Sequence, residues 1–211
     1  MIDYYTWPTP NGRKASIALE EMGLAYNVKL VDLSAKEQFK PEFLALNPNN
    51  KIPVIVDPDG PDGEPHTVFE SGAILLYLAR KTGQFLPSDP KALSIVEQWL
   101  FFQTANVGPM FGQLYHFART APEQIDYAIK RYETEMERIL RVLDGRLSKT
   151  AYIAGDDYTI ADMAAFPWVA AGKMLGSELT SYPSLKSWTD RVSGRDAVQR
   201  GMAVPTRPTD K

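Results

Sequence analysis

The sequence predicts a two-domain protein, with an α/β domain first and an all-helical domain second. Short apolar runs that suit strands occur only within the first 70 residues. Residues 82–90 are rich in Gly, Pro and Ser, and the apolar residues beyond them recur at helical spacing. The chain of 211 residues is 44% hydrophobic and 23% charged. This length and composition suffice for two separate cores.

The first half of the α/β domain has the pattern strand, helix, strand. Residues 2–6 are apolar and aromatic, and turn-forming residues follow at 8–12. The next apolar positions, at three- and four-residue spacing, predict a helix, and residues 26–31 alternate as a second strand. Such a βαβ unit closes into a parallel pair of strands.

The second half of this domain has the pattern strand, strand, helix. Residues 39–47 can form a short helix, and residues 53–56 and 67–69 flank a turn-rich segment typical of a β-hairpin. Ser71 opens an apolar helix that ends near Gly83. The βαβ-ββα order is that of a thioredoxin-like sheet, which we expect to occupy residues 1–82.

The all-helical C-terminal domain is expected over residues 90–211. Its clearest helix has an apolar stripe from Ile125 to Leu147 at three- and four-residue spacing. We interpret this stripe as core. The tail at 201–211 is polar and contains proline, so we expect it to fray.

Composition excludes several function classes. The formal net charge of −3 and the pI near 5.5 do not attract a polyanion, so nucleic acid is not an expected partner. The chain has no cysteine, which excludes disulfides, thiolate metal sites and redox chemistry on its own thiols, and two histidines do not favour a metal site.

The same criteria bear on location. The longest apolar run, residues 73–79, is far shorter than the roughly 20 residues of a membrane span. The first residues lack the features of a secretory signal. We therefore expect a cytoplasmic protein with no membrane partner.

Ile52 and Pro53 stand where the third strand begins, a position that tolerates proline. About 5–6% of such bonds are cis in folded proteins, so the residues alone favour trans. In a thioredoxin-like sheet, however, this proline is typically cis. The backbone of residue 52 then faces outward, where an extended peptide can pair with it as an added strand.

Two helix starts are candidates for binding charged groups. Ser71 can simply cap its helix, or its hydroxyl and the first N–H groups can bind a carboxylate while Glu70 holds an ammonium. An α-amino acid end carries both charges. At the first helix, Asn11 can be a cap, or Thr9 and Asn11 can favour a thiolate beside the positive helix end. The ligand would supply that sulfur.

These segments together resemble the glutathione transferase family. They read PTPNG at 8–12, NPNNKIP at 47–53 and FESGAI at 69–74, and Thr159 with Asp162 resembles the family's buried capping box. With WLFFQ at 99–103 and GPM at 108–110, they look most like the bacterial nu-class, YfcG-like group. The resemblance implies the glutathione transferase fold and a homodimer.

The resemblance also implies glutathione-dependent disulfide-bond reductase activity, with two glutathiones or one glutathione disulfide held per site. By matching motif, Thr9 and Asn11 would contact the sulfurs. Ile52, which precedes Pro53, would pair with the cysteinyl backbone.

The remaining implied contacts are with the charged groups of glutathione. Glu70 and Ser71 would hold the γ-glutamyl end, with Gln38 and Lys51 near the glycyl carboxylate. Arg131 would reach in from the helical domain, although an arginine at this position also fits a solvated helix face.

Other activities use the same bound thiolate. Conjugation of glutathione to electrophiles and peroxide reduction are the enzymatic alternatives. Tyr4 or Tyr5 could serve conjugation, since a tyrosine at the end of the first strand does so in several classes, but core packing suits both better. A non-catalytic glutathione-binding regulator is a further alternative, because a fungal relative of the family has this role.

Overall fold

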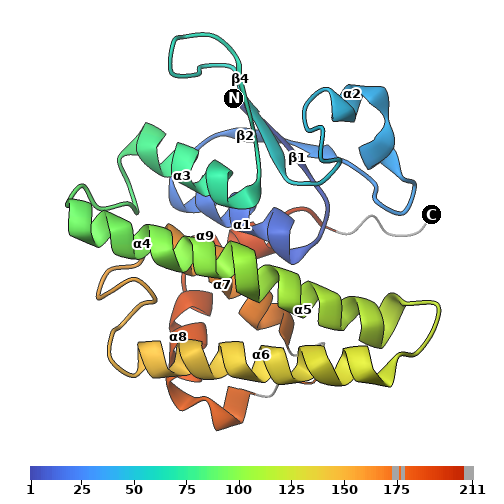
Figure 1. Cartoon of the computed structure of the whole chain (residues 1–211). Helices are drawn as coiled ribbons and strands as arrows, with labels where there is room; N and C mark the ends of the chain where they lie inside the picture. Colours follow the sequence, from blue (N-terminus) through green and yellow to red (C-terminus); the bar gives the residue numbers. More distant parts are fainter. Residues whose placement is uncertain (173–175, 177–178, 207–211) are drawn as a thin grey trace. The chain divides into compact units, whose positions relative to one another are not determined.

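A computed structural model of the chain describes residues 1–172, 176 and 179–206 (Figure 1). It divides into two compact units, Met1–Leu86 together with the segment from Arg195 onward, and Pro87–Gly194. The sequence placed all of residues 90–211 in the helical domain. The grouping differs because helix α9 (Asp196–Ala203) packs on α1 (Pro10–Glu21) of the first unit.

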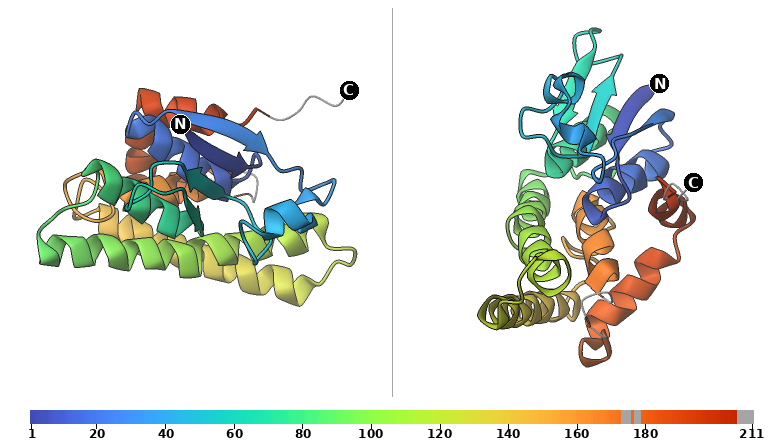
Figure 2. Two further views of the ribbon diagram at one scale, coloured as in Figure 1. Left: turned by 90° about the horizontal axis from the view of Figure 1, so that it is seen from above. Right: turned by 90° about the vertical axis from the view of Figure 1, so that its right-hand side faces the viewer.

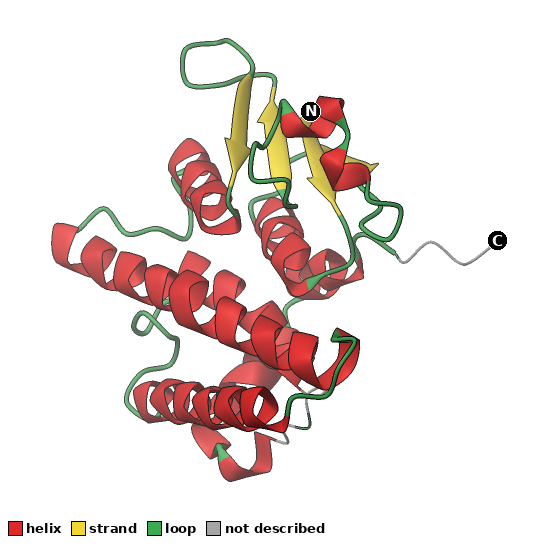
Figure 3. Cartoon of the chain, turned by 45° about the vertical axis from the view of Figure 1, so that its right-hand side comes forward, coloured by secondary structure: helices red, strands yellow, loops and turns green. Residues whose placement is uncertain are grey.

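The first unit contains a four-stranded mixed sheet in the order β2-β1-β3-β4 (Figure 3). Its strands are β1 (Ile2–Thr6), β2 (Tyr26–Leu30), β3 (Val54–Asp57) and β4 (His66–Phe69). β1 is parallel to β2 and antiparallel to β3, which is antiparallel to β4. This topology confirms the predicted thioredoxin-like βαβ-ββα order.

The two faces of the sheet are covered by different helices. Alternate residues of a strand point to opposite faces. The hydroxyl of Tyr4 accordingly donates to the backbone oxygen of Gly12 on α1, whereas Tyr5 packs against Phe43 of α2 (Pro41–Leu44). Helix α3 (Ser71–Thr82) packs beside α1 and contacts β3 and β4.

The predicted helix over residues 39–47 is wrong in extent. The structure has a 3₁₀ turn, η1 (Glu37–Phe39), and then α2, separated by Lys40 in an extended conformation. A residue before proline avoids the helical region, so Pro41 ends one turn and begins the next. Strand β2 ends one residue earlier than expected.

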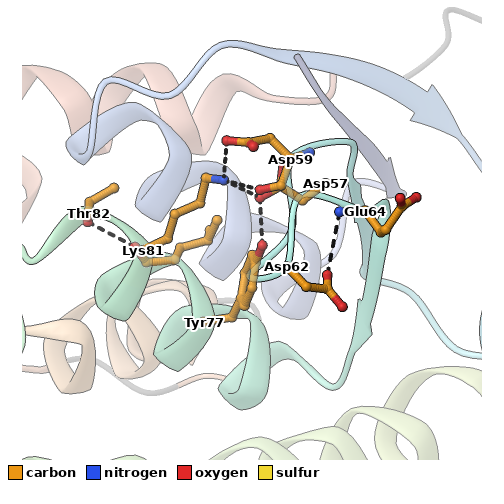
Figure 4. A network of polar contacts seen from close by, with 8 residues as sticks. Asp57, Asp59, Asp62, Glu64, Tyr77, Lys81 and Thr82 are labelled. Carbon is orange, nitrogen blue, oxygen red and sulfur yellow. Dashed lines mark hydrogen bonds and ion pairs between the residues drawn. The ribbon is translucent and has the colours of Figure 1, made fainter.

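The β3–β4 hairpin is held against α3 by a polar network at Asp57 (Figure 4). The Asp57 side chain is 2% exposed, and its carboxylate accepts a 2.6 Å hydrogen bond from Tyr77 and lies 2.9 Å from the Lys81 ammonium. Lys81 also lies 3.2 Å from a carboxylate oxygen of Asp59. Hydrogen bonds from Tyr77 and Lys81 outweigh burial, which on its own would raise the pKa of Asp57, and leave that pKa below its ordinary value.

Helix α9 lies alongside α1 in both views of Figure 2. The Ser16 hydroxyl donates to the backbone oxygen of Gly201 at 2.7 Å. A Cβ atom at Gly201 would lie 2.6 Å from the Cα of Ile17, so only glycine permits this approach. The expectation that the tail frays from residue 201 is therefore wrong for Gly201 to Ala203; residues 207–211 lie outside the described residues.

The described residues of the second unit form helices and loops, with no strand. One helical run is interrupted by a first π turn and ends in a second, and further helices pack on it. The run comprises α4 (Pro90–Phe102), η2 (Gln103–Val107), α5 (Gly108–Tyr115) and η3 (His116–Thr120), and is followed by α6 (Asp126–Leu147), α7 (Ile160–Ala171), the 3₁₀ turn η5 (Leu179–Ser181) and α8 (Pro183–Ser193).

The predicted apolar stripe of α6 is core only in its second half, from Met136 to Leu147. Ile125 precedes the helix and is exposed. The capping box of α7 is confirmed, since Thr159 caps the helix and the buried Asp162 accepts from its backbone N–H at 3.0 Å. Within the described ranges, no helix is both long and apolar enough to cross a membrane.

Candidate functional site

Strand register brings three chain segments to one end of the sheet. Tyr5 of β1 pairs with Val54 of β3, which pairs with Phe69 of β4. Because β3 is antiparallel to both neighbours, the end of β1, the start of β3 and the end of β4 coincide. The start of α1, the Ile52–Pro53 bond and the start of α3 therefore lie close together. All three were predicted to bind ligand.

Thr9 caps the first helix. Its hydroxyl oxygen accepts from the backbone N–H of Gly12 at 3.2 Å, and Pro10 occupies the first helical position. Asn11 lies one residue inside the helix and is not the cap. A Cβ atom at Gly12 would lie 2.5 Å from the Thr6 hydroxyl oxygen and 2.6 Å from the Trp7 carbonyl oxygen. Glycine thus lets this first turn sit directly on the strand end.

Tyr4 is not placed to serve a sulfur. It is fully buried, its hydroxyl donates to Gly12 and accepts from Thr6 at 2.8 Å, and burial raises its pKa well above the ordinary value. Tyr5 is half-buried against Phe43 on the opposite face of the sheet. Both tyrosines pack in the first unit, as expected.

Asn47 organises the loop before β3. It is buried, its amide nitrogen donates to the Lys51 backbone oxygen at 2.7 Å, and its amide oxygen accepts from the Asn49 N–H at 2.9 Å. The Ile52–Pro53 bond that follows is cis, and both residues are buried. The Lys51 side chain is exposed. Sequence reasoning quoted Asn47 within a motif but gave it no role.

Glu70 has an unusual backbone conformation at the start of α3. Its φ of 68° lies in the left-handed region, which non-glycine residues seldom adopt outside functional or tightly constrained sites. Glu70 itself occupies the N-cap position, and Ser71 is the first helical residue. The Glu70 carboxylate is exposed and accepts from the Asn49 side chain at 3.4 Å. The loop before β3 and the start of α3 are thereby joined.

Lys14 is a site residue that sequence reasoning missed. Its side chain is 2% exposed, and its ammonium donates to the Ser71 hydroxyl at 3.2 Å. Burial lowers the pKa of Lys14 to about 7, although the Glu70 carboxylate acts in the opposite direction. One signal was available, since Lys14 stands four residues before Ala18 and so shares the buried face of α1.

Two further predicted residues lie outside this set of contacts. Gln38 is in η1, and its amide oxygen is buried without a hydrogen-bond partner among the described residues. Arg131 belongs to α6 of the second unit, where it is exposed and borders a cavity of about 550 Å³ with Met110, Tyr127 and Tyr132.

A cavity in the first unit does not include the predicted site, and the described residues contain no metal-binding group. A cavity of about 620 Å³ beside the hairpin network is lined by His66, Leu76 and Arg80 among others, and includes none of the predicted site residues. Within the described part of the chain, no three His, Cys, Asp or Glu side chains are grouped to bind a metal ion. At the start of α3, by contrast, the Ser71 hydroxyl lies within hydrogen-bond distance of the buried Lys14 ammonium and beside the exposed carboxylate of Glu70.

Comparison with known proteins identifies relatives of both units. Residues 1–80 match the model of the glutathione S-transferase N-terminal domain, and residues 106–196 match that of the C-terminal domain. The chain is 48% identical to the disulfide-bond oxidoreductase YfcG of Escherichia coli, over 96% of this chain and 94% of YfcG. It is 40% identical to YghU of the same organism, also named a disulfide-bond oxidoreductase, over 96% and 74%.

Solved structures of similar proteins contain glutathione. A glutathione transferase from Burkholderia graminis, with two glutathione molecules bound per subunit, has a TM-score of 0.92 at 45% identity and covers 98% of this chain and 89% of its own. One from Pseudomonas putida, with one glutathione disulfide per subunit, has a TM-score of 0.90 at 42% identity, with coverage of 97% and 91%.

Proposed function

The chain belongs to the glutathione S-transferase family, and we propose that it reduces disulfide bonds with bound glutathione as the thiol donor. The observation that carries this proposal is the meeting of three segments at one end of the sheet. Each segment offers the chemistry that one part of the tripeptide needs.

The proposed placement of glutathione follows from those segments. Glu70 and Ser71 take the ammonium and carboxylate of the γ-glutamyl end, and the backbone of Ile52 pairs with the cysteinyl residue. The sulfur then lies toward Thr9 and Asn11. The Lys51 ammonium and the amide N–H group of Gln38 are the donors that we propose for the glycyl carboxylate.

Thr9 can help to stabilise the sulfur anion. Its hydroxyl oxygen already accepts from the Gly12 N–H, so its own hydrogen is available to donate to a sulfur. The positive end of the α1 dipole adds to this effect. Both interactions favour thiolate over thiol, and so lower the pKa of the glutathione thiol.

The proposed reaction is two successive thiol–disulfide exchanges. The thiolate of one glutathione attacks a small disulfide, forms a mixed disulfide and releases the first substrate thiolate. The thiolate of a second glutathione attacks the mixed disulfide at the glutathione sulfur, which forms glutathione disulfide and releases the second substrate thiolate. Both electrons come from the two glutathiones. The protein, which has no cysteine, contributes orientation and charge stabilisation.

Two observations favour disulfide reduction over conjugation or peroxide reduction. Tyr4 is buried with its hydroxyl occupied, so a tyrosine-activated thiolate is not supported here. Relatives at 48% and 40% identity are named disulfide-bond oxidoreductases, and similar structures hold two glutathiones or one glutathione disulfide per subunit. A non-catalytic glutathione-binding role is the second candidate.

The finer assignments are proposals on the same basis. We place the protein in the nu class, with residues 1–82 as the main part of the glutathione-binding domain, the helices from residue 90 to the end of α8 as the helical domain, and Arg131 as a contact from the helical domain. We further propose a homodimer, because the family resemblance implies one, and a cytoplasmic location, where reduced glutathione is abundant.

Turnover of a small disulfide with glutathione tests the function, run beside assays with a hydroperoxide and an aryl halide. We expect the disulfide to be the best substrate. Asn11→Ala should depress this turnover, whereas Asn27→Ala, which removes an exposed amide bonded to Asp3, should not. Glutathione binding without any turnover would favour the regulatory alternative. Unchanged turnover in the Asn11 variant would remove that residue from the mechanism.

A further inference from the structure

We infer that Lys14 is a positioning residue of the proposed glutathione site, where its buried ammonium orients the Ser71 hydroxyl and supplies positive charge beneath the γ-glutamyl carboxylate. The inference rests on the proposed function and extends it to a residue with no motif of its own. Lys14 would act through Ser71 and would not touch the reacting sulfur.

The direction of one hydrogen bond is the first step. The Lys14 ammonium lies 3.2 Å from the Ser71 hydroxyl oxygen, and an ammonium can only donate. When Lys14 is charged, Ser71 must accept in this bond, and the hydroxyl hydrogen of Ser71 is then left to donate elsewhere. An anion at the start of α3 is the partner that such a hydrogen and the first helical N–H groups favour.

The burial of the charge is the second step. Lys14 is 2% exposed, and a buried ammonium is costly unless an anion is near. Glu70, at the N-cap of α3, is the anion that influences Lys14, but its carboxylate is exposed. Glu70 is proposed to bind the ligand ammonium, and a ligand carboxylate at the start of α3 would add a second negative charge close to Lys14.

Other charged groups lie on the elements that pack against α1, and those on α9 form ion pairs away from Lys14. On α9, Arg195 and Arg200 pair with Glu21 and Glu20 at the opposite end of α1 from Lys14. On α1 itself, Arg13 is the adjacent residue.

The sheet contributes Tyr4 beneath α1, and its raised pKa keeps it neutral at physiological pH. A carboxylate that arrives at Ser71 therefore changes the electrostatic surroundings of Lys14 more than those of these groups.

Proton uptake on binding follows from this arrangement. With a pKa of about 7, Lys14 is only partly protonated in the free protein at pH 7.5. A bound carboxylate raises that pKa, so binding draws a proton onto Lys14. The direction of the pH dependence follows. A ligand that prefers the charged lysine binds best below pH 7, and its affinity falls as the pH rises through the pKa that Lys14 has in the free protein.

Calorimetry with S-methylglutathione tests this on the full chain, because that ligand has no ionisable thiol. Titrations at pH 7.5 in two buffers of different ionisation enthalpy give the number of protons exchanged. We expect the wild-type protein to take up about half a proton or more. Lys14→Met should bind at least about tenfold more weakly and take up correspondingly fewer protons, and the difference between the two proteins cancels any contribution from the ligand amine.

Lys81→Met is the matched control. It makes the same chemical change in the same unit, but Lys81 is bound to Asp57 and Asp59 on the hairpin. It should bind S-methylglutathione as the wild-type protein does, with the same proton uptake. Equal affinity and uptake in wild type and the Lys14 variant would overturn the inference.

If Lys14→Met does not fold, a second ligand tests the inference on the wild-type protein. This ligand is S-methylglutathione with its γ-glutamyl carboxylate replaced by a carboxamide. The wild-type protein should bind it more weakly, and should take up no proton beyond those gained by the ligand amine, whose pKa is titrated separately for each ligand. The same uptake with both ligands, after this amine contribution is subtracted, would again overturn the inference and leave the proposed function intact. If S-methylglutathione does not bind wild-type protein at millimolar concentration, the proposed site itself fails, and the role of Lys14 with it.

Discussion

The phenol of Tyr77 donates a 2.6 Å hydrogen bond to the Asp57 carboxylate and thereby joins α3 to the end of β3. Both elements also position the proposed site, since β3 begins directly after Pro53 and α3 begins at Ser71. The bond lies away from the site, since Asp57 is the last residue of β3 and Tyr77 lies nearly two turns beyond Ser71 in α3. It can therefore be removed to measure how much the hairpin contributes to stability.

Tyr77→Phe should lower the free energy of unfolding by about 1–2 kcal/mol at pH 7. Because the folded protein depresses the pKa of Asp57, this stabilisation is present above the unfolded pKa and is lost as the pH falls through the folded one. Urea unfolding at pH 7 and pH 3 should thus give a smaller difference from wild type at the lower pH.

Tyr127→Phe is the control for this measurement, because Tyr127 is 78% exposed. It should unfold as the wild-type protein does at both pH values. An equal loss of stability at pH 7 and pH 3 in the Tyr77 variant would contradict the assigned role of the Asp57 carboxylate.

Thr9→Val should reduce turnover of a small disulfide by about tenfold to a hundredfold, because a hydrogen bond to an anionic sulfur is lost. It also removes the cap of α1, at a cost of about 1 kcal/mol in stability. Thr9→Ser preserves the hydroxyl and should retain both turnover and stability. Steady-state kinetics with thermal unfolding separates the two effects. Turnover that follows stability in every variant would limit Thr9 to capping.

Glu70→Gln should raise KM for glutathione about tenfold and change kcat little, because the charge on Glu70 is proposed to hold a ligand ammonium equally in the ground and transition states. Glutamine retains the side-chain length at this unusual backbone position. Glu64→Gln, a change at an exposed glutamate of the hairpin loop, should alter neither constant. A fall in kcat with unchanged KM would contradict the binding role.

The outline of the fold could be predicted because each element carries a local signal. An apolar and aromatic run marked β1, alternation marked β2, turn residues marked the hairpin, and Gly83, which has a left-handed φ of 67°, marked the end of α3. Residues 39–47 were harder to assign, because Pro41 divides them into two short pieces. The place of α9 could not be predicted, since the Ser16–Gly201 contact joins residues 185 positions apart.

Some residues of the candidate site could likewise be predicted from the sequence, and others could not. Thr9, Ile52 and Ser71 stand at element ends within recognisable motifs, so the sequence indicates them. Lys14 lies inside a helix, and a single lysine on a buried face usually extends its ammonium to solvent. Only the packing of α1 on α3 reveals that this ammonium ends at Ser71. The backbone conformation of Glu70 is likewise a property of the folded chain.

Asp162→Asn should destabilise the protein by about 3 kcal/mol or more, because this buried carboxylate accepts from three different residues. Its oxygens bind the backbone N–H groups of Thr159 and Ile153, each at 3.0 Å, and the Trp188 indole at 2.8 Å. An asparagine would point an N–H group at one of these donors. Urea unfolding measures the loss, and Thr159→Ser, which keeps the cap, should be near neutral. A small effect in the Asn variant would mean that the network can rearrange.

Gly201→Ala and Gly145→Ala should change stability in opposite directions, although both replace a glycine within a helix. The new methyl at position 201 would lie 2.6 Å from Ile17, so α9 must move away from α1, at a cost of about 1–3 kcal/mol. Position 145 in α6 has no atom within 4 Å of its Cβ, so alanine there should add about 0.5–1 kcal/mol through helix propensity alone. Chemical unfolding of both variants checks the pair. Stabilisation by both would mean that α9 does not pack closely on α1 in solution, because propensity would then outweigh the contact.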